Sequence, residues 1–244
     1  MLIDTTPISS AGGGPARPVS PGAQPSFDPT LAHRARARKV LAAKRQHERY
    51  RDNPWLFLTE AVITIDPHDK KTPLKPFPDL AYLKRFTEIW LANRRVLVPK
   101  SRRMIISWTC IALHVWLMLF FEHEYIFFAA RKEGRNESQG SLELVKRAKM
   151  ILENFKNFTP PPTTSNIGSI FCPKTGSHIE AVPEGGNQFR QLTATAIFAD
   201  EMAFWEDARK TYTSAIPTIE ANGRFTGVST ANPSFFCDLV HDRV

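Results

Sequence analysis

Acidic, hydroxyl and amide side chains stand at the ends of two apolar segments of this sequence. The segment 194–200 ends with Asp200 and is followed by Glu201. The segment 224–230 ends with Ser229 and Thr230 and is followed two residues later by Asn232. One carboxylate of such a pair can hold Mg²⁺ while its neighbour polarises an attacking water molecule. The hydroxyl and amide groups could hydrogen-bond a terminal phosphate or that water. The combination therefore suits hydrolysis that releases a terminal phosphate, although an Asp-Glu pair after a strand is often only a turn or a helix cap.

A basic loop within VLVPKSRRMIIS, residues 96–107, is the third element that could take part in this chemistry. Its polar residues after the apolar run are Lys100, Ser101, Arg102 and Arg103. A phosphate-binding loop usually reads G-x-x-x-x-G-K-[ST], whose glycines allow close backbone approach and whose lysine reaches the phosphates. Here no glycine is present, and Ile106 stands in the lysine's place, directly before Ser107. The loop is thus either a degenerate nucleotide site or a solvated basic turn.

Four apolar segments must position these groups, and they have the length and composition of buried strands. They are residues 94–99, 124–130, 194–200 and 224–230. Helical patterns lie between them, such as the apolar spacing of Leu142, Val145, Ala148, Leu152 and Phe155. Alternating strands and helices predict an α/β fold with a central, mostly parallel sheet and helices on both faces. Ligands of such sheets bind at the carboxyl ends of the strands, where the polar groups are expected.

Residues 105–121 form an almost uninterrupted apolar run, close to the length that spans a bilayer. Ser107, Thr109 and His114 interrupt the run. A helix buried on all sides within an α/β domain is equally apolar around its circumference. We therefore expect a buried helix rather than a membrane span.

The positive charge is concentrated near the N-terminus. The 244 residues carry a net charge of +8, of which residues 31–51 carry +7 from eight Lys or Arg and one Glu. Residues 1–30 contain six prolines and four glycines and are expected to be a disordered tail. Residues 31–66 are expected to form a basic helical extension, either solvated or in contact with nucleic acid or a partner protein, and 67–244 a nucleotide-hydrolase domain. Within the extension, Asn53 and Pro54 predict the start of a helix.

Three cysteines without C-x-x-C spacing argue against a disulfide framework and against a zinc site. The N-terminus lacks the pattern of a signal peptide, so that export is not indicated. These features favour a reducing cytoplasm.

The order of the motifs resembles that of the ATPase domain in the large terminase subunit of tailed bacteriophages. The resemblance covers residues 74–233 and rests on VPKSRRMIISW as an unorthodox Walker A loop, FRQLTATAIFADEMAFW as the Walker B region, and GVSTANP as the coupling motif. The fold that it implies is a P-loop ATPase sandwich. A glycine-free loop is compatible with this resemblance, because helix N-terminal amides attract phosphate whatever side chains they carry.

Matched residue by residue, the resemblance assigns roles to the polar groups. Ser107 and Asp200 are expected to hold Mg²⁺ and Glu201 to activate water. Lys100, Ser101, Arg102 and Arg103 are expected to bind the phosphates of ATP, with Arg102 matching the arginine most typical of these loops and acting in catalysis. The residues of the coupling motif are expected to transmit phosphate release to the surface that grips DNA; they are Ser229, Thr230 and Asn232. Ile105 and Ile106 replace the usual glycine and lysine, which leaves a catalytically silent protein as an alternative.

Three further residues match the family less closely. Phe77, next to Lys75 and Pro76, falls where the family contacts adenine; it is expected either to stack on the base or to be a core residue. Arg131 could face a phosphate, although a plain surface arginine is the better expectation. Arg190 matches an arginine before the Walker B strand, without a role.

The resemblance implies ATP hydrolysis that drives double-stranded DNA into a viral procapsid, in the cytoplasm of an infected bacterial host. The expected partners are a portal protein, a small terminase subunit and further copies of the chain in a ring. Members of the family usually carry a nuclease domain after the ATPase domain, whereas this chain ends shortly after GVSTANP and shows no second cluster of carboxylates in its sequence. No nuclease activity is therefore expected, and the chain is expected to be a fragment or a split gene product. The alternatives are a helicase-like DNA translocase and a catalytically silent adaptor that binds DNA or a partner through residues 31–51.

Overall fold

The computed structural model describes residues 29–66, 68–131, 139–190, 193–219 and 222–243. The chain divides into two compact units, residues 1–42 and 43–244. In the first unit the described residues belong to helix α1, which spans Pro29–Asp52 and ends in the second unit. All other elements belong to the second unit.

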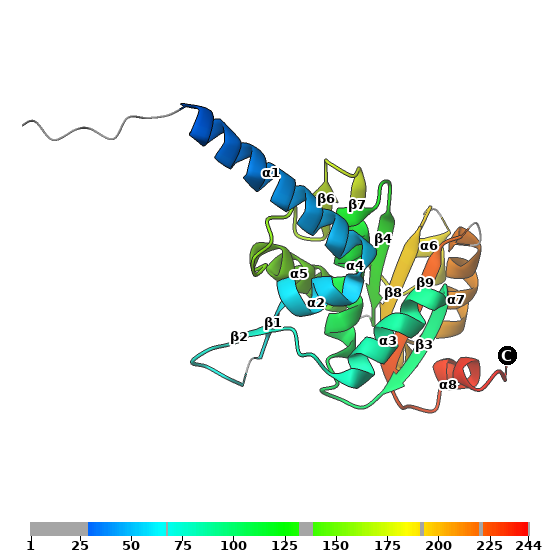
Figure 1. Ribbon diagram of the computed structural model, residues 1–244. Helices are drawn as coiled ribbons and strands as arrows, with labels where there is room; N and C mark the ends of the chain where they lie inside the picture. The colour runs from blue at the N-terminus through cyan, green and yellow to red at the C-terminus, as the bar shows by residue number, and fades with distance from the viewer. Residues whose placement is uncertain (1–28, 67, 132–138, 191–192, 220–221, 244) are drawn as a thin grey trace, which may run out of the picture. The chain divides into compact units, whose positions relative to one another are not determined.

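The second unit contains seven further helices and nine strands among its described residues (Figure 1). The helices are α2 Pro54–Ala61, α3 Ala81–Ala92, α4 Ile106–Phe120, α5 Gln139–Glu153, α6 Gly186–Phe189, α7 Ala208–Ala215 and α8 Phe235–Val240. The strands are β1 Ile63–Ile65, β2 Leu74–Pro76, β3 Arg95–Lys100, β4 Tyr125–Ala130, β5 Thr164–Ser165, β6 Ser169–Cys172, β7 Ser177–Pro183, β8 Ala196–Asp200 and β9 Arg224–Thr230. Short 3-10 turns follow β8 and α7.

The main sheet has seven strands in the order β3-β9-β8-β4-β7-β6-β5. The first five are parallel to their neighbours, and β6 and β5 are antiparallel. The four strands predicted from the sequence are β3, β9, β8 and β4, which lie side by side. The mostly parallel α/β fold is therefore confirmed. Strands β5, β6 and β7 were not predicted from the sequence, nor was the separate hairpin of β1 and β2.

Alternate residues of the central strands face two hydrophobic cores, one on each side of the sheet. Phe128 and Phe198 belong to the core under α2, α3, α4 and α5. Phe127 and Ile197 belong to the core under α7 and α8. Successive strand residues point to opposite faces, so that the unbroken apolar sequence of these strands is what two covered faces require. This arrangement confirms helices on both faces of the sheet.

Helix α4 is the apolar run that the sequence assigned to the protein interior. Twelve of its fifteen residues are buried. Trp116 at its C-terminal part donates a hydrogen bond from Nε1 to the Tyr50 carbonyl, at 2.8 Å. Among the described residues, no helix has both the length and the apolar character to span a membrane. Helix α2 begins as predicted, with Asn53 accepting a hydrogen bond from Leu56 N at 3.1 Å and Pro54 in the first turn.

Candidate functional site

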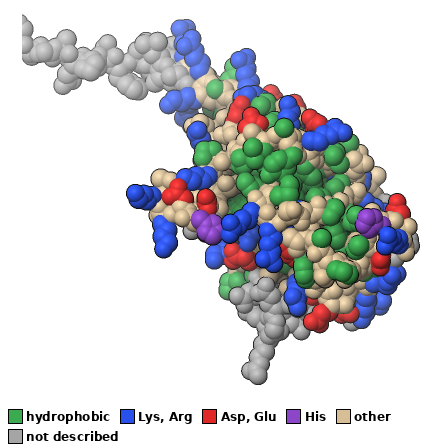
Figure 2. Space-filling model, turned by 90° about the horizontal axis from the view of Figure 1, so that it is seen from below, with side chains coloured by type: hydrophobic (Ala, Val, Ile, Leu, Met, Phe, Trp, Pro, Cys, Tyr) green, Lys and Arg blue, Asp and Glu red, His purple; other side chains and the backbone are tan. Residues whose placement is uncertain are grey.

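Strands β3, β8 and β9 end together at one edge of the sheet, and this edge carries the groups singled out from the sequence. The register pairs Lys100 with Thr230 and Asp200 with Val228. Figure 2 shows this end of the molecule, where hydrophobic side chains gather near the middle and Lys and Arg side chains lie toward the outline. The parallel topology thus brings three distant sequence segments to one place.

The loop between β3 and α4 adopts glycine-like backbone conformations without glycine. Arg103 and Ile105 have φ angles of 64° and 59°, in the left-handed region. A branched residue rarely adopts this region, and such strain costs on the order of 1–3 kcal/mol. The loop is tied to its surroundings because Tyr82 of α3 donates a hydrogen bond to the Met104 carbonyl at 3.0 Å. Ile105 thus keeps the bend that a glycine would otherwise allow.

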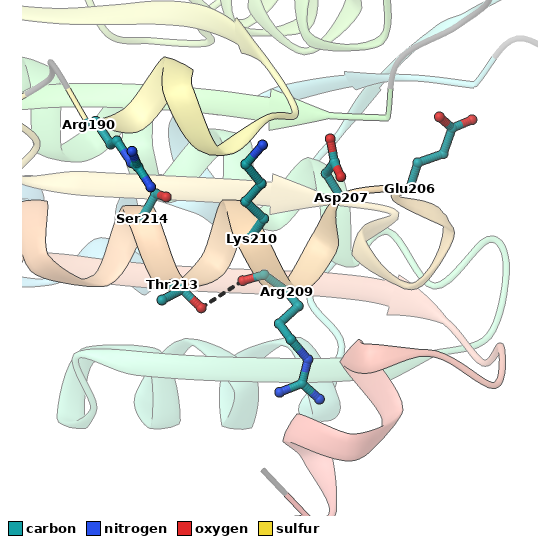
Figure 3. Close-up of a pocket in the computed structure, with 7 residues that line it drawn as sticks. All are labelled: Arg190, Glu206, Asp207, Arg209, Lys210, Thr213 and Ser214. Atoms are coloured by element: carbon teal, nitrogen blue, oxygen red, sulfur yellow. Dashed lines mark hydrogen bonds between the residues drawn. The ribbon is translucent and has the colours of Figure 1, made fainter.

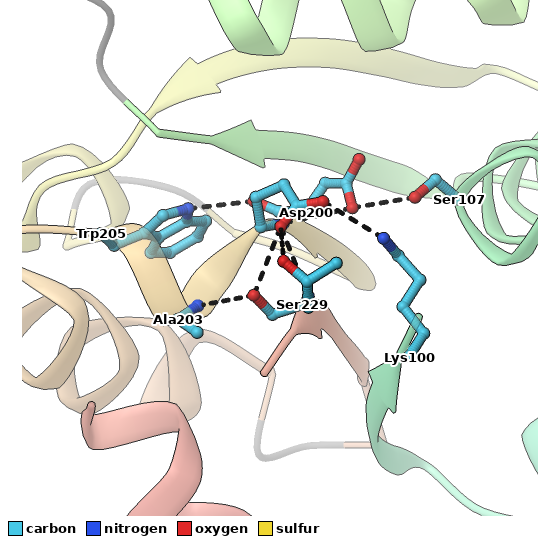
Figure 4. A network of polar contacts seen from close by, with 8 residues as sticks. Lys100, Ser107, Asp200, Ala203, Trp205 and Ser229 are labelled. Atoms are coloured by element: carbon cyan, nitrogen blue, oxygen red, sulfur yellow. Dashed lines mark hydrogen bonds and ion pairs between the residues drawn. The ribbon is translucent and has the colours of Figure 1, made fainter. Parts of the chain in front are cut away.

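Ser107 and Asp200 form the pair of oxygens that was predicted to hold Mg²⁺. The Ser107 hydroxyl donates to Asp200 Oδ1 at 2.9 Å (Figure 4). Two neighbouring ligands of an octahedral Mg²⁺, each about 2.1 Å from the ion, are separated by about 3.0 Å, close to this distance. The described residues contain no group of three or more His, Cys, Asp or Glu that could hold a metal. A serine hydroxyl and one carboxylate would leave the other coordination positions of Mg²⁺ to water and substrate oxygens, which commonly fill them.

Asp200 is buried, with 8% of its surface exposed. Burial raises the pKa of its carboxyl group, as does the charge of Glu201, while the Ser107 hydrogen bond and the charge of Lys100 lower it; the net shift is upward. Its backbone carbonyl accepts a hydrogen bond from Trp205 Nε1 at 3.0 Å. A buried carboxylate with a raised pKa gains from a nearby cation, which favours its ionised form.

Glu201 lies next to Asp200 but has different partners. Its Oε1 is 3.2 Å from Lys100 Nζ, and its Oε2 accepts hydrogen bonds from the Thr230 hydroxyl at 3.1 Å and the Thr230 amide at 3.4 Å. Burial would raise the pKa of Glu201, but Lys100 and Thr230 together outweigh it, and the pKa is lowered. The carboxylate is thus ionised at neutral pH, and its side chain remains 41% exposed. It can accept a proton from a bound water molecule.

The residues predicted to couple phosphate release to movement contact the acidic turn directly. The backbone N–H of Ala203, in the 3-10 turn after Glu201, donates to the Ser229 hydroxyl at 3.0 Å. The Asn232 side chain donates to the Ala203 carbonyl, also at 3.0 Å. Glu201 has a φ of 51°, so that its backbone is also in the left-handed region. The end of β9 and the turn after β8 are therefore linked by several hydrogen bonds.

The other predicted phosphate ligands lie on the exposed part of the loop. Ser101, Arg102 and Arg103 are exposed. Within the described parts of the chain they have no hydrogen bond or ion pair. Two of the cations expected to bind phosphate are thus free to do so, while Lys100 is held by Glu201.

Phe77 lies in the hydrophobic core, which is the second of the two placements expected for it. Its ring is 3% exposed, belongs to the core, and meets Trp55 edge-on with ring centroids 6.1 Å apart. A ring enclosed in this way offers no free face to a base, so that the alternative of a core residue is the one that the structure favours. Neighbouring Lys75 forms an ion pair with Asp69 at 2.6 Å.

Arg131 and Arg190 lie outside the polar network. Arg131 is exposed just after β4. Arg190 lines a separate pocket of about 370 Å³ beside α7. Arg209 and Lys210 also line this pocket. Figure 3 shows these two side chains on opposite sides of α7, with Arg209 extending toward α8, where its guanidinium lies 4.5 Å from the centre of the Phe235 ring. Glu206 and Asp207 make the pocket mixed in charge.

Two residues near the site were not given roles from the sequence. Trp205 donates a hydrogen bond to the Asp200 carbonyl. It is the last residue of FRQLTATAIFADEMAFW, and the sequence gave no reason for a tryptophan there. Arg147 of α5 lies over the Trp108 ring, 5.6 Å from its centre, and its charge opposes the upward shift in the pKa of Asp200. Helical spacing placed α5 in the fold, but it could not show that this helix brings a cation near the acidic pair.

Comparisons with known proteins identify the fold. No family model and no curated protein matches the chain. Sixteen chains of solved structures match it. The large terminase of bacteriophage HK97 aligns with a TM-score of 0.57 and 12% identity over 77% of this chain. An ATPase-domain variant of the Thermus phage P74-26 large terminase aligns with a TM-score of 0.48 and 12% identity, over 66% of this chain and 68% of that one.

The large terminase of a thermophilic bacteriophage, in complex with ADP, aligns with a TM-score of 0.46 and 12% identity, over 62% of this chain and 39% of that one. The aligned part spans 40% of the length of the HK97 protein. The HK97 comparison shows that this chain shares the fold of the aligned part of that terminase, which agrees with the resemblance found in the sequence motifs.

Proposed function

We propose that this chain is the ATP-hydrolysing motor domain of a DNA-packaging terminase, which uses ATP and Mg²⁺ to move double-stranded DNA into a procapsid. The observation that carries the proposal is the meeting of Lys100, the Ser107–Asp200 pair and the Glu201–Thr230 pair at one edge of the sheet. These are the three parts that phosphoryl transfer needs: a cation for the phosphates, a metal site and a group that orients water.

The phosphates of ATP would lie against the loop between β3 and α4. Arg102 and Arg103 are exposed and Lys100 lies next to Glu201, so that positive charge is available both on the exposed part of the loop and beside the acidic pair. Bound Mg²⁺ would neutralise the outer phosphate oxygens, and Ser107 and Asp200 would hold it. Since their oxygens already lie 2.9 Å apart, little movement is needed to receive the ion.

Glu201 would act as the general base. Its carboxylate accepts a proton from the attacking water, whose oxygen bonds to the terminal phosphorus, while the bond from that phosphorus to the bridging oxygen breaks and ADP leaves. The lowered pKa of Glu201 keeps it in the ionised form that this step requires. Thr230 and Ser229 lie beside the same carboxylate. Release of the phosphate would therefore change the hydrogen bonds at the end of strand β9 first.

The proposal extends to partners and location by analogy with the fold. A portal protein, a small terminase subunit and further copies of this chain in a ring are the partners proposed, within the cytoplasm of an infected bacterium. DNA contact is proposed to be mainly with phosphates and thus dependent on salt.

The test is an ATPase assay with and without double-stranded DNA. Glu201→Gln should bind ATP and lose turnover, and Arg102→Ala should weaken both. Glu206→Gln is the matched control, because Glu206 is an exposed carboxylate nearby that has no part in the network. Turnover by Glu201→Gln at the wild-type rate would remove Glu201 from the mechanism. Absence of turnover in the wild type would instead favour a silent adaptor, and strand separation without packaging would favour a helicase-like translocase.

A further inference from the structure

A second polar cavity lies far from the site in the sheet order and has no place in the proposed hydrolysis. It has a volume of about 520 Å³. Its walls come from the last turns of α1, the segment after α5 and the turn between β6 and β7. The residues that matter to its chemistry are Lys44, His47, Glu48, Arg51, Phe158 and Lys174. All belong to the second unit of the chain.

The cavity has a fixed frame. Gln46 donates a hydrogen bond from its side chain to the Asn157 carbonyl at 2.8 Å, which joins α1 to the segment after α5. The His47 ring packs on Phe120 of α4, with ring centroids 4.7 Å apart. Phe158 stacks on the same Phe120 ring, with centroids 5.9 Å apart. The walls are therefore held by packing and hydrogen bonds.

The charge of the cavity is positive. Lys44, Arg51 and Lys174 face it together with one acid, Glu48. Arg51 also pairs with Asp52, at 2.9 Å. Lys44 and Lys174 are exposed and have no ion-pair partner among the residues that the structure describes. An anionic group that entered the cavity would find uncompensated cations on two of its walls.

The pKa of His47 depends on this positive charge. Burial lowers the pKa of its imidazole, and the charges of Lys174 and Arg51 lower it further against the opposing effect of Glu48. Its Nε2 is buried and has no hydrogen-bond partner in the described parts of the chain. The ring is therefore neutral at pH 7, and it is close enough to Lys174 and Arg51 to sense whether an anion neutralises them.

We propose that this cavity binds backbone phosphate of double-stranded nucleic acid. Cationic side chains at the end of one helix and on a neighbouring turn are suited to phosphate contacts, which position a nucleic acid without reading its sequence. Residues 31–51 carry a net charge of +7, which a polyanion can neutralise along its length and a single acidic side chain cannot. The proposal does not depend on ATP hydrolysis, so that it can be tested without nucleotide.

The experiment compares binding of a double-stranded DNA oligonucleotide at several salt concentrations. Lys44→Glu/Lys174→Glu replaces two cations of the cavity with anions. Lys70→Glu/Lys84→Glu is the matched control, with the same change in net charge at exposed lysines outside the cavity. Each phosphate contact contributes about 0.9 to the slope of log affinity against log salt. The cavity variant should therefore lose about 2 in slope while the control keeps the wild-type slope, and thermal unfolding should show that both variants are folded.

A second readout is the pKa of His47 by NMR titration. DNA should raise this pKa toward its usual value in the wild type, because bound phosphate offsets Lys174 and Arg51. Equal slopes for the cavity variant and the control, or an unchanged His47 pKa at saturating DNA, would overturn the proposal. A poly-glutamate peptide that raises the His47 pKa where DNA does not would also overturn it, in favour of an acidic protein partner.

Discussion

The variant Lys100→Met distinguishes the contribution of the Lys100–Glu201 ion pair to folding stability from the contribution of Lys100 to the rate of ATP hydrolysis. At the observed 3.2 Å and an effective dielectric constant of about 20, the gross attraction is about 5 kcal/mol. Lys100 is only 9% exposed, but Glu201 is 41% exposed, so that solvent screening reduces the net contribution to about 1 kcal/mol. Folded domains have about 5–15 kcal/mol of stability. The variant should therefore remain folded, with a slightly lower melting temperature.

The expected effect on turnover is much larger. Removal of one group that stabilises charge developing in a transition state typically costs about 10²–10³ in kcat. If Lys100 leaves Glu201 to contact the phosphates, Lys100→Met should lose this factor.

The assay measures kcat and KM for ATP together with thermal unfolding of wild type, Lys100→Met and Lys100→Arg. The arginine variant keeps the charge and should recover part of the activity. A fall of less than about fivefold in kcat for Lys100→Met, in a variant that is fully folded, would refute the reasoning. Lys100 would then be only the structural partner of Glu201.

Three predictions concern the fold. Burial holds the pKa of His114 at about 3, below its usual value, so that the unfolded chain binds a proton at a higher pH than the folded protein does. The free energy of unfolding should therefore fall between about pH 6.5 and pH 3, by at most about 1.4 kcal/mol per pH unit. Urea unfolding at several pH values should show a weaker dependence of this free energy on pH in His114→Leu than in the wild type. Arg224→Met removes a buried guanidinium that donates hydrogen bonds to the carbonyls of Trp90 and Asn93 and lies 3.8 Å from the Trp90 ring centre. The free energy of unfolding should fall by about 2–4 kcal/mol, and a fall of less than about 1 kcal/mol would show that these contacts do not stabilise the fold. Asn53→Ala removes the cap of α2 and should lower the unfolding free energy by about 1 kcal/mol, whereas no change would mean that Pro54 alone starts the helix.

The central strands could be predicted because both faces of the sheet are covered. Residues such as Phe127 and Phe128 face opposite cores, so that the sequence of β4 is apolar without interruption. Strand β7 was not predicted because its exposed Glu180 and half-buried His178 interrupt the apolar pattern. Its position in the sheet is determined by pairing with β4 and β6. That pairing is a tertiary effect, which local sequence does not carry.

The site was predictable as a set of strand ends but not as a set of contacts. Parallel topology alone brings Lys100, Asp200 and Thr230 to one edge, and the sequence order of the motifs indicated that topology. Which cation pairs with Glu201 depends on side-chain reach and loop bend, and the bend rests on the unfavourable φ of Ile105. Burial of Phe77 depends on packing against Trp55, which is also not visible in the local pattern.

The most direct measurement is a crystal structure of this chain with Mg²⁺ and an ATP analogue that is not hydrolysed. The account predicts Mg²⁺ about 2.1 Å from the Ser107 hydroxyl oxygen, with the terminal phosphate between Lys100 and Glu201 and the 3.2 Å ion pair opened. A nucleotide bound elsewhere, with the Ser107–Asp200 hydrogen bond still at 2.9 Å, would contradict it.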